Sequence, residues 1–206
     1  SWGVSTRFVG AIIMTHGDDQ GLIFPPRLAP IQIVIVPIYR NDEQKAQVMP
    51  VVEKVEQMLE GVRVHVDDRE ELTPGFKFND WEMRGVPLRI EIGPKDVEKG
   101  SVAMARRDMP GRDGKSFVPQ DGLAETVTEM LVTIQEAMLA KATAFRDANI
   151  HEVDTWDDFV ETVKDGWAYC WWDGTDETEA KIKELTKATT RCIPLEQPEE
   201  KGKCIY

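Results

Sequence analysis

Apolar and polar positions along the first third of the chain follow the pattern of a strand, a helix and a second strand. Residues 31–38 form a continuous, mostly β-branched apolar run, which is typical of a strand buried on both faces of a sheet. From Asp42 to Glu60 the apolar residues recur at helical spacing, and Pro50 predicts a kink or a restart there. Residues 62–66 alternate and predict a half-exposed strand. Together these elements indicate a parallel, right-handed βαβ unit.

The next segment predicts a helix and two paired strands. Thr73-Pro74 is a typical helix start, and the helix should run to Arg84. Residues 88–92 predict a strand that is closed by a turn at 93–96. Residues 101–106 then predict a second strand that pairs with it through this turn.

The rest of the chain predicts one long helix and a smaller α/β unit. The long helix should run from Leu123 to about Ala148. Its apolar stripe consists of Leu123, Val127, Leu131, Ile134, Met138 and Phe145. Beyond it we expect a short helix capped by Asp154 or Thr155, an aromatic strand at 167–172 and a helix at 177–187.

The first thirty residues contain a helix that is apolar on every side, from Phe8 to Met14. Such a helix has to be buried, and no earlier residue of the chain could bury it. The stretch starts without a methionine, in what we interpret as the middle of a strand, and it ends at Pro25-Pro26 and Pro30. We therefore expect the sequence to be a piece of a larger folded protein.

The same stretch resembles a known family. The run Trp2-Gly3-Val4-Ser5-Thr6-Arg7, the apolar helix and the strings THGDDQGL and PPRLAP resemble the third signature motif of class II aminoacyl-tRNA synthetases. More narrowly, they resemble prolyl-tRNA synthetases of the archaeal/eukaryote-like type. The resemblance implies that Arg7 contacts ATP with Ser5 beside it, and that Trp2 and Gly3 line the proline pocket. Arginine suits this role because it can hold a polyphosphate and an adenine plane. Without the resemblance, Arg7 would be typical of a solvated arginine and Trp2 of a core aromatic.

Charge points to one region of the chain. The 206 residues carry a formal charge of −12, which argues against a protein that coats nucleic acid through bulk charge. Between Glu82 and Lys115, however, eight Lys/Arg and six Asp/Glu give +2, which leaves −14 for the rest. The three cysteines form no even framework and indicate a reducing compartment. No apolar run reaches the roughly 18–20 residues that a membrane span needs.

The string FKFNDWEMRGVPLR at 76–89 leads into this region, and GPKD follows at 93–96. Aromatic rings can stack on unpaired bases, Arg and Glu can read base edges, and Lys can hold phosphate. A capped amphipathic helix with a solvated charged face explains the composition equally well. The string also resembles the anticodon-binding domain of the same family. That resemblance implies contacts to the proline anticodon from Glu82, Arg89, Lys95 and Asp96.

His16, Asp18 and Asp19 lie close enough in sequence to suggest metal ligands. A turn at the end of a helix, whose polar groups bind backbone amides, explains them better. We therefore assign no metal ligand in the chain.

The C-terminal segment departs from the family pattern. Many relatives hold zinc there through two cysteine pairs, which would make a closed tetrahedral site. Here Asp173 and Thr178 correspond to the first pair, and Cys204 is left alone. A structural zinc is therefore not expected, and Cys170 and Cys192 are interpreted as small buried side chains.

The predicted fold class is α/β. We expect the end of a class II catalytic domain at 1–29, an anticodon-binding domain with a mixed central sheet and flanking helices at 30–149, and a smaller α/β domain at 150–206. The resemblance implies a cytoplasmic, homodimeric proline–tRNA ligase that activates proline with ATP and Mg²⁺ and transfers it to tRNA(Pro). The dimer contacts would lie in the missing catalytic domain, and this piece alone should be inactive.

Two alternatives belong to other functional classes. A non-catalytic RNA-binding accessory protein would share the anticodon-binding fold, but it would have no use for the ATP-contacting residues 2–7. A generic nucleotide-binding module would need a glycine-rich phosphate loop after Ile38. The sequence there is Tyr39-Arg40-Asn41-Asp42, so this alternative is discarded.

Overall fold

The computed structural model describes residues 3–197, 199 and 202–206. The chain divides into two compact units, residues 1–142 and 143–206. Within the described residues, no helix combines the length and the apolar character needed to cross a membrane.

A mixed five-stranded sheet forms the centre of the first unit. Its strands are β1 (Ile33–Pro37), β2 (Val64–Val66), β3 (Leu88–Ile92), β4 (Ser101–Arg106) and β5 (Lys115–Pro119), in the order β2-β1-β3-β4-β5. β1 pairs in parallel with both β2 and β3, while β4 and β5 add antiparallel pairs. The predicted βαβ unit and mixed sheet are therefore confirmed.

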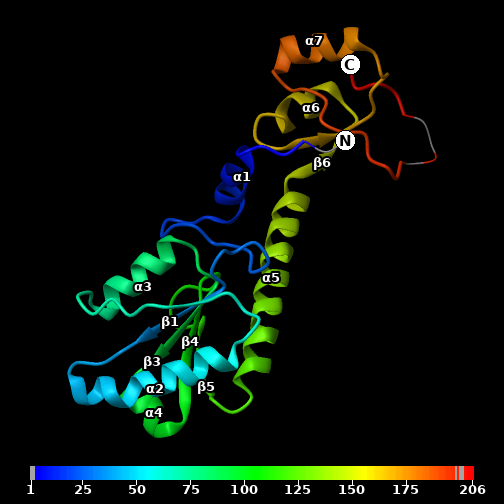
Figure 1. Ribbon diagram of the computed structural model, residues 1–206. Coiled ribbons are helices and arrows are strands. Elements are labelled where there is room, and N and C mark those ends of the chain that lie inside the picture. The colour runs from blue at the N-terminus through cyan, green and yellow to red at the C-terminus, as the bar shows by residue number, and fades with distance from the viewer. Residues whose placement is uncertain (1–2, 198, 200–201) are drawn as a thin grey trace. The chain divides into compact units, whose positions relative to one another are not determined.

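Helix α2 (Asp42–Met58) covers one face of this sheet (Figure 1). The side chain of Asn41 caps it by accepting a hydrogen bond from the N–H of Gln44 at 2.9 Å, which satisfies one of the free amides of the first turn. The helix runs through Pro50 without a break, so the predicted restart is wrong. Val48, Val52 and Val55 are buried and share a core with Ile33 and other residues of the sheet.

The second helix on this face is α5 (Leu123–Ala148), whose bounds agree with the prediction. Leu123, Val127 and Leu131 join the same core as α2, and Ile134 and Met138 pack on Ile23. Phe145 was expected on this apolar stripe, but it is 73% exposed. It belongs to the range of the second unit.

Helix α3 (Pro74–Met83) packs on the opposite face of the sheet. Thr73 caps it as predicted, and Pro74 occupies its first turn. Its Trp81 is buried against Val34 and Val36 of β1, which alternate with the β1 residues of the other core. The strand β1 is thus buried on both faces, as its continuous apolar run predicts.

The connection between β3 and β4 differs from the prediction. The expected turn at 93–96 is the start of a short helix, α4 (Pro94–Lys99). Proline in the first turn and a left-handed Gly100 at the end are typical helix signals that a turn assignment overlooks. The antiparallel pairing of the two flanking strands is confirmed.

The second unit is a small α/β arrangement. It contains β6 (Ile150–Glu152), α6 (Trp156–Thr162), β7 (Trp167–Tyr169) and α7 (Asp176–Thr186). β6 and β7 pair in parallel, and Val153, Phe159, Ile182 and Ile205 form the core. Thr155 and Thr175 cap the two helices with their side chains. Cys192 is exposed, so its predicted burial is wrong, whereas Cys170 packs against this core.

The opening segment has a helix where one was predicted, α1 (Arg7–His16). Residues 3–5 are irregular, so the expected strand is not present in the part of this segment that is described. No residue of α1 is buried, and Phe8 and Val9 are each 59% exposed. The described part of the chain thus leaves α1 without the burial that its apolar composition favours.

Candidate functional site

The structure brings together two of the four residues predicted to contact an anticodon. Glu82 lies in the last turn of α3, and Arg89 lies near the start of β3. Nη1 of Arg89 donates to Oε1 of Glu82 at 2.7 Å, and its Nε donates to Oε1 of Glu91 at 3.1 Å. The guanidinium also lies over the ring of Phe78, 4.1 Å from the centroid. These contacts fix the guanidinium from three directions.

Two charged residues that sequence reasoning missed extend this pair. Glu91 is buried on β3, and Nζ of Lys115 on β5 donates to its Oε2 at 2.6 Å. We use the name ionic row for the resulting series of Glu82, Arg89, Glu91 and Lys115. It crosses the sheet over β4, where only the methyl groups of Ala103 and Ala105 lie between β3 and β5.

An exposed aromatic residue borders the ionic row. In the sheet register, Glu91, Ala103 and Phe117 lie side by side on this face. Phe117 is 70% exposed. A flat ring beside paired charges is suited to stacking on an unpaired base. The alternation Lys-Ser-Phe-Val-Pro in 115–119 is the signal that could have identified this strand.

The other two predicted contacts lie at the far end of β3. Lys95 is exposed on α4, and the carboxylate of Asp96 accepts a hydrogen bond from the N–H of Gly93 at 2.9 Å. The rest of β3, about 10 Å at 3.3 Å per residue, separates them from Arg89. The four residues therefore form two pairs rather than one cluster.

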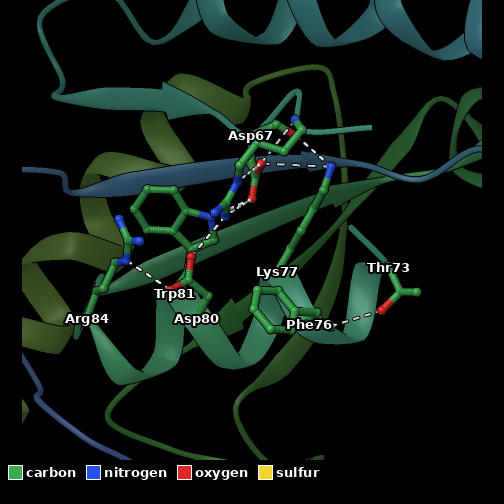
Figure 2. Close-up of polar contacts among 8 residues, drawn as sticks. Asp67, Thr73, Phe76, Lys77, Asp80, Trp81 and Arg84 are labelled. Atoms are coloured by element: carbon green, nitrogen blue, oxygen red, sulfur yellow. Dashed lines mark hydrogen bonds and ion pairs between the residues drawn. The ribbon is translucent and has the colours of Figure 1, made fainter. Parts of the chain in front are cut away.

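A buried carboxylate anchors the sheet side of α3 (Figure 2). Asp67 follows β2, and its side chain accepts hydrogen bonds from Nε and Nη2 of Arg69 at 2.8 and 2.7 Å. Nε1 of Trp81 donates to the same carboxylate at 2.7 Å. Nζ of Lys77 donates to the backbone oxygen of Asp67 at 3.0 Å, and Arg69 also reaches Asp80 at 3.0 Å. We call these five residues the Asp67 network.

The pKa of Asp67 reflects two opposing effects. Burial by itself raises the pKa, but the hydrogen bonds from Arg69 and Trp81 outweigh burial and hold the pKa well below its usual range. The carboxylate is therefore charged at neutral pH and pins α3 to the end of β2.

The Asp67 network corrects part of the sequence interpretation. Lys77 and Trp81 belong to the string predicted to stack on bases and hold phosphate, but both are buried. Figure 2 shows both side chains turned toward Asp67. Two pairs of side chains on α3 therefore have different partners. Phe78 and Glu82 contact Arg89. Lys77 and Trp81 bind Asp67 and hold the helix in place.

Asp18, considered above as a metal ligand, is a partner of Arg107. Nη1 and Nη2 of Arg107 donate to the two carboxylate oxygens at 2.8 and 2.6 Å. The carboxylate also accepts from the N–H of Gln20 at 2.9 Å, as expected for a turn. Among the described residues, no three His, Cys, Asp or Glu side chains are grouped so that they could hold a metal ion.

The residues predicted to contact ATP lie on an exposed hollow at the start of α1. The hollow is lined by Gly3, Val4, Ser5, Arg7, Phe8 and Ala11. Arg7 and Ser5 offer a cation and a hydroxyl, which fit the phosphates of ATP. Among the described residues, the lining contains no carboxylate for Mg²⁺, so a magnesium ion would depend on other groups. Trp2, assigned to the proline pocket with Gly3, lies outside the described residues.

The positions that correspond to a zinc site do not fit that metal. The hydroxyl of Thr178 donates to Oδ2 of Asp173 at 2.8 Å, and Asp173 also accepts from the N–H and hydroxyl of Thr175 at 3.0 Å. These contacts close the turn before α7. A neutral hydroxyl is not a zinc ligand of the usual thiolate, imidazole or carboxylate type.

Two family profiles match the chain. Residues 32–130, which contain the whole ionic row and the Asp67 network, match a profile described as an anticodon binding domain. Residues 156–206 match a profile described as the C-terminal region of prolyl-tRNA synthetase.

Individual proteins agree with these profiles. A proline–tRNA ligase of Roseiflexus sp. (strain RS-1) is 57% identical over 207 residues, covering 100% of this chain and 43% of the relative. A chloroplastic/mitochondrial proline–tRNA ligase of Arabidopsis thaliana is 49% identical, covering 100% of the chain and 39% of the relative.

The solved structure of prolyl-tRNA synthetase from Cryptosporidium parvum, complexed with halofuginone and AMPPNP, is also similar. It has a TM-score of 0.88 and 37% identity, and the match covers 100% of this chain and 43% of that one. The chain thus spans less than half the length of the relatives it matches. The predicted resemblance and the α/β fold class are confirmed, and the chain belongs to the prolyl-tRNA synthetase family, whose C-terminal part it matches.

Proposed function

We propose that this chain provides the anticodon-reading part, and one wall of the ATP site, of a proline–tRNA ligase. The whole enzyme would activate proline with ATP and Mg²⁺ and transfer it to tRNA(Pro). It would act as a cytoplasmic homodimer, with the dimer contacts in the catalytic domain. The names of the relatives and the match to an anticodon binding domain support this proposal.

The ionic row is the observation that carries the RNA-reading role. Lys115 and Glu82 are partly exposed and offer a donor and an acceptor on one face of the sheet, and Arg89 and Glu91 link them. A base edge displays donors and acceptors together, so a row of alternating charge can read a base that a purely basic patch would only attract. Phe117 offers the ring on which such a base stacks.

Lys95 and Asp96 would contact a different part of the anticodon loop. They lie beyond the carboxyl end of β3, whereas Glu82 and Arg89 lie near its start. A single-stranded loop that crosses β3 would meet one pair after the other. The hydrogen bond from Gly93 to Asp96 already holds that carboxylate in place, which lowers the entropy lost when it binds RNA.

Arg7 and Ser5 would act on ATP. The charged guanidinium of Arg7 can balance the negative charge of the phosphates, and the hydroxyl of Ser5 can donate a hydrogen bond to a phosphate oxygen. Gly3, together with Trp2, would line the proline pocket. We expect the 206-residue chain by itself to catalyse no proline-dependent pyrophosphate exchange, because most of an intact ligase lies outside it. Exchange clearly above background would contradict this expectation.

An anticodon transplant tests the RNA-reading role. The chain is titrated with tRNA(Pro), with a tRNA of another identity, and with that second tRNA carrying the proline anticodon. We expect the affinity to follow the anticodon, so that the transplanted tRNA binds like tRNA(Pro). An affinity that follows the tRNA body instead would contradict the proposal.

A further inference from the structure

Arg107 joins two segments that are far apart in the sequence. Its side chain is only 2% exposed, and its two terminal nitrogens hold the carboxylate of Asp18. Its third contact is made by Nε, which donates to the backbone oxygen of Glu82 at 2.8 Å. Asp18 and Arg107 are 89 positions apart, so the contact is formed by the fold.

Each partner of Arg107 lies on, or just after, a helix that carries a predicted contact residue. Asp18 lies two residues after the end of α1, the helix that begins at Arg7. Glu82 lies in the last turn of α3, and its own side chain holds Arg89 at 2.7 Å. The backbone oxygen of Glu82 also accepts a hydrogen bond from the N–H of Gly85 at 3.0 Å, so Arg107 adds a charged donor to an oxygen that already closes the end of α3.

The two segments also touch along their backbones. The N–H of Leu22 donates to the oxygen of Met83 at 3.1 Å, and the N–H of Phe24 donates to the oxygen of Gly85 at 3.0 Å. A side chain at Gly85 would place its Cβ 2.6 Å from the oxygen of Leu22. The segment after α1 is therefore packed directly against the end of α3.

The electrostatics of this contact favour both charges. The hydrogen bonds from the Arg107 guanidinium are the largest reason why the pKa of Asp18 is lowered from its ordinary value. A nearly buried guanidinium needs such an anion, because an unpaired buried charge is strongly unfavourable. Loss of either partner would therefore leave the other charge unpaired and weaken the hold of Arg107 on the backbone of Glu82.

We propose that Arg107 is a positioning residue that holds Glu82 in place for reading RNA, and that its hold on Asp18 couples this reading to the segment that follows α1. The inference rests on the proposed function of Glu82 and Arg89. If the packing of residues 17–24 strengthens RNA binding through Arg107, then RNA binding must strengthen that packing by the same factor, since coupling between two sites is reciprocal.

Three variants test the proposal. Asp18→Asn and Arg107→Lys weaken the two ends of the contact while keeping polar side chains in place. Asp108→Asn is the matched control, because Asp108 likewise accepts two hydrogen bonds from a neighbouring arginine, Arg106. Each variant is titrated with an RNA stem-loop that carries the proline anticodon and with the same stem-loop carrying one changed anticodon base.

We expect Asp18→Asn and Arg107→Lys to reduce the preference for the proline anticodon at least fivefold, with Asp108→Asn close to the original chain. Hydrogen exchange supplies a second measurement. If Arg107 had a purely structural role, RNA binding would not change the exchange rates of amides near Asp18. Bound stem-loop should slow the exchange of the amides of Gly21, Leu22 and Phe24 in the original chain and in Asp108→Asn, but not in Asp18→Asn.

The outcomes separate this inference from the proposed function. A preference unchanged in Asp18→Asn and Arg107→Lys, or reduced equally in Asp108→Asn, would overturn the inference while leaving the proposed function intact. An Arg89→Lys chain that keeps the full preference would overturn the proposed function, and the inference with it.

Discussion

Trp81 donates a hydrogen bond from its indole Nε1 to the carboxylate of Asp67 at 2.7 Å, and both side chains are buried. The bond joins the buried face of α3 to the residue that follows β2. Because Glu82 is the next residue of the same helix, the position of α3 decides where one of the proposed RNA contacts lies.

Replacing Asp67 by asparagine should destabilise the first unit. The substitution keeps the shape of the side chain but removes the negative charge that Arg69 and Lys77 face. Breaking a buried ion pair by removing one partner costs about 3 kcal/mol or more, and we expect a loss of this size in the free energy of unfolding. Urea unfolding of the two chains measures it.

Asp68 supplies the control for this experiment, since it is the adjacent aspartate and is exposed. Asp68→Asn should change the free energy of unfolding by less than about 0.5 kcal/mol. Equal effects of the two substitutions would show that Asp67 is not the anchor of α3.

Stability should also depend on pH through Asp67. Its pKa is lower in the folded chain than in the unfolded chain, where it is about 3.9. The stabilisation is therefore fully present above about pH 5 and is lost as the pH falls below about 4 toward the lower folded pKa. Unfolding followed between pH 7 and pH 3 should show a steeper loss in the original chain than in Asp67→Asn. Parallel curves would contradict the assignment.

Gly85→Ala should cost more stability than Gly100→Ala. Both glycines have positive φ values, 75° and 61°, so alanine is strained at either position, by about 1 kcal/mol. Only at Gly85 would the new Cβ also collide with a backbone oxygen, that of Leu22; nothing lies within 4 Å at Gly100. The additional cost should be roughly 1–3 kcal/mol, as for other overpacked sites. Thermal unfolding of both variants checks this, and equal losses would contradict the close packing of Leu22 on Gly85.

The periodicity of apolar residues predicted the elements whose apolar faces are buried in the core. The run at 31–38 fits a strand buried on both faces, and the helical pattern of α2 fits a helix buried on one face. Both are what the structure contains. The restart predicted at Pro50 is absent for a physical reason. The proline lies in the ninth position of α2 on the exposed side, where the helix continues despite the missing N–H.

Elements with little buried surface were missed. The residues of β5 that point outward, Lys115, Phe117 and Pro119, are exposed, and its inward residues are only partly buried. β6 is three residues long and exposed throughout. Such strands are held by backbone pairing with neighbours, so β5 leaves a short alternation in the sequence as its signal and β6 leaves none.

The candidate site was predictable in part. The string at 76–89 indicated the right helix and strand, and the family resemblance singled out Glu82 and Arg89, which the structure places in contact. Glu91 and Lys115 could not be assigned without the sheet register that brings β5 next to β4 and β3. The roles of Lys77 and Trp81 depend on which face of α3 is buried, and this required the position of Asp67.

The central claim is that the ionic row reads the proline anticodon through Arg89. The most direct measurement is the dissociation constant of the chain, and of Arg89→Lys, for two RNA stem-loops. One carries the proline anticodon, and the other differs from it in a single anticodon base, at a position that is the same in all proline codons. Lysine keeps the charge but cannot contact Glu82 and Glu91 as the guanidinium does. We expect the original chain to prefer the proline anticodon at least tenfold, about 1.4 kcal/mol, and Arg89→Lys to lose most of that preference. No preference in the original chain, or the same preference in both chains, would contradict the claim.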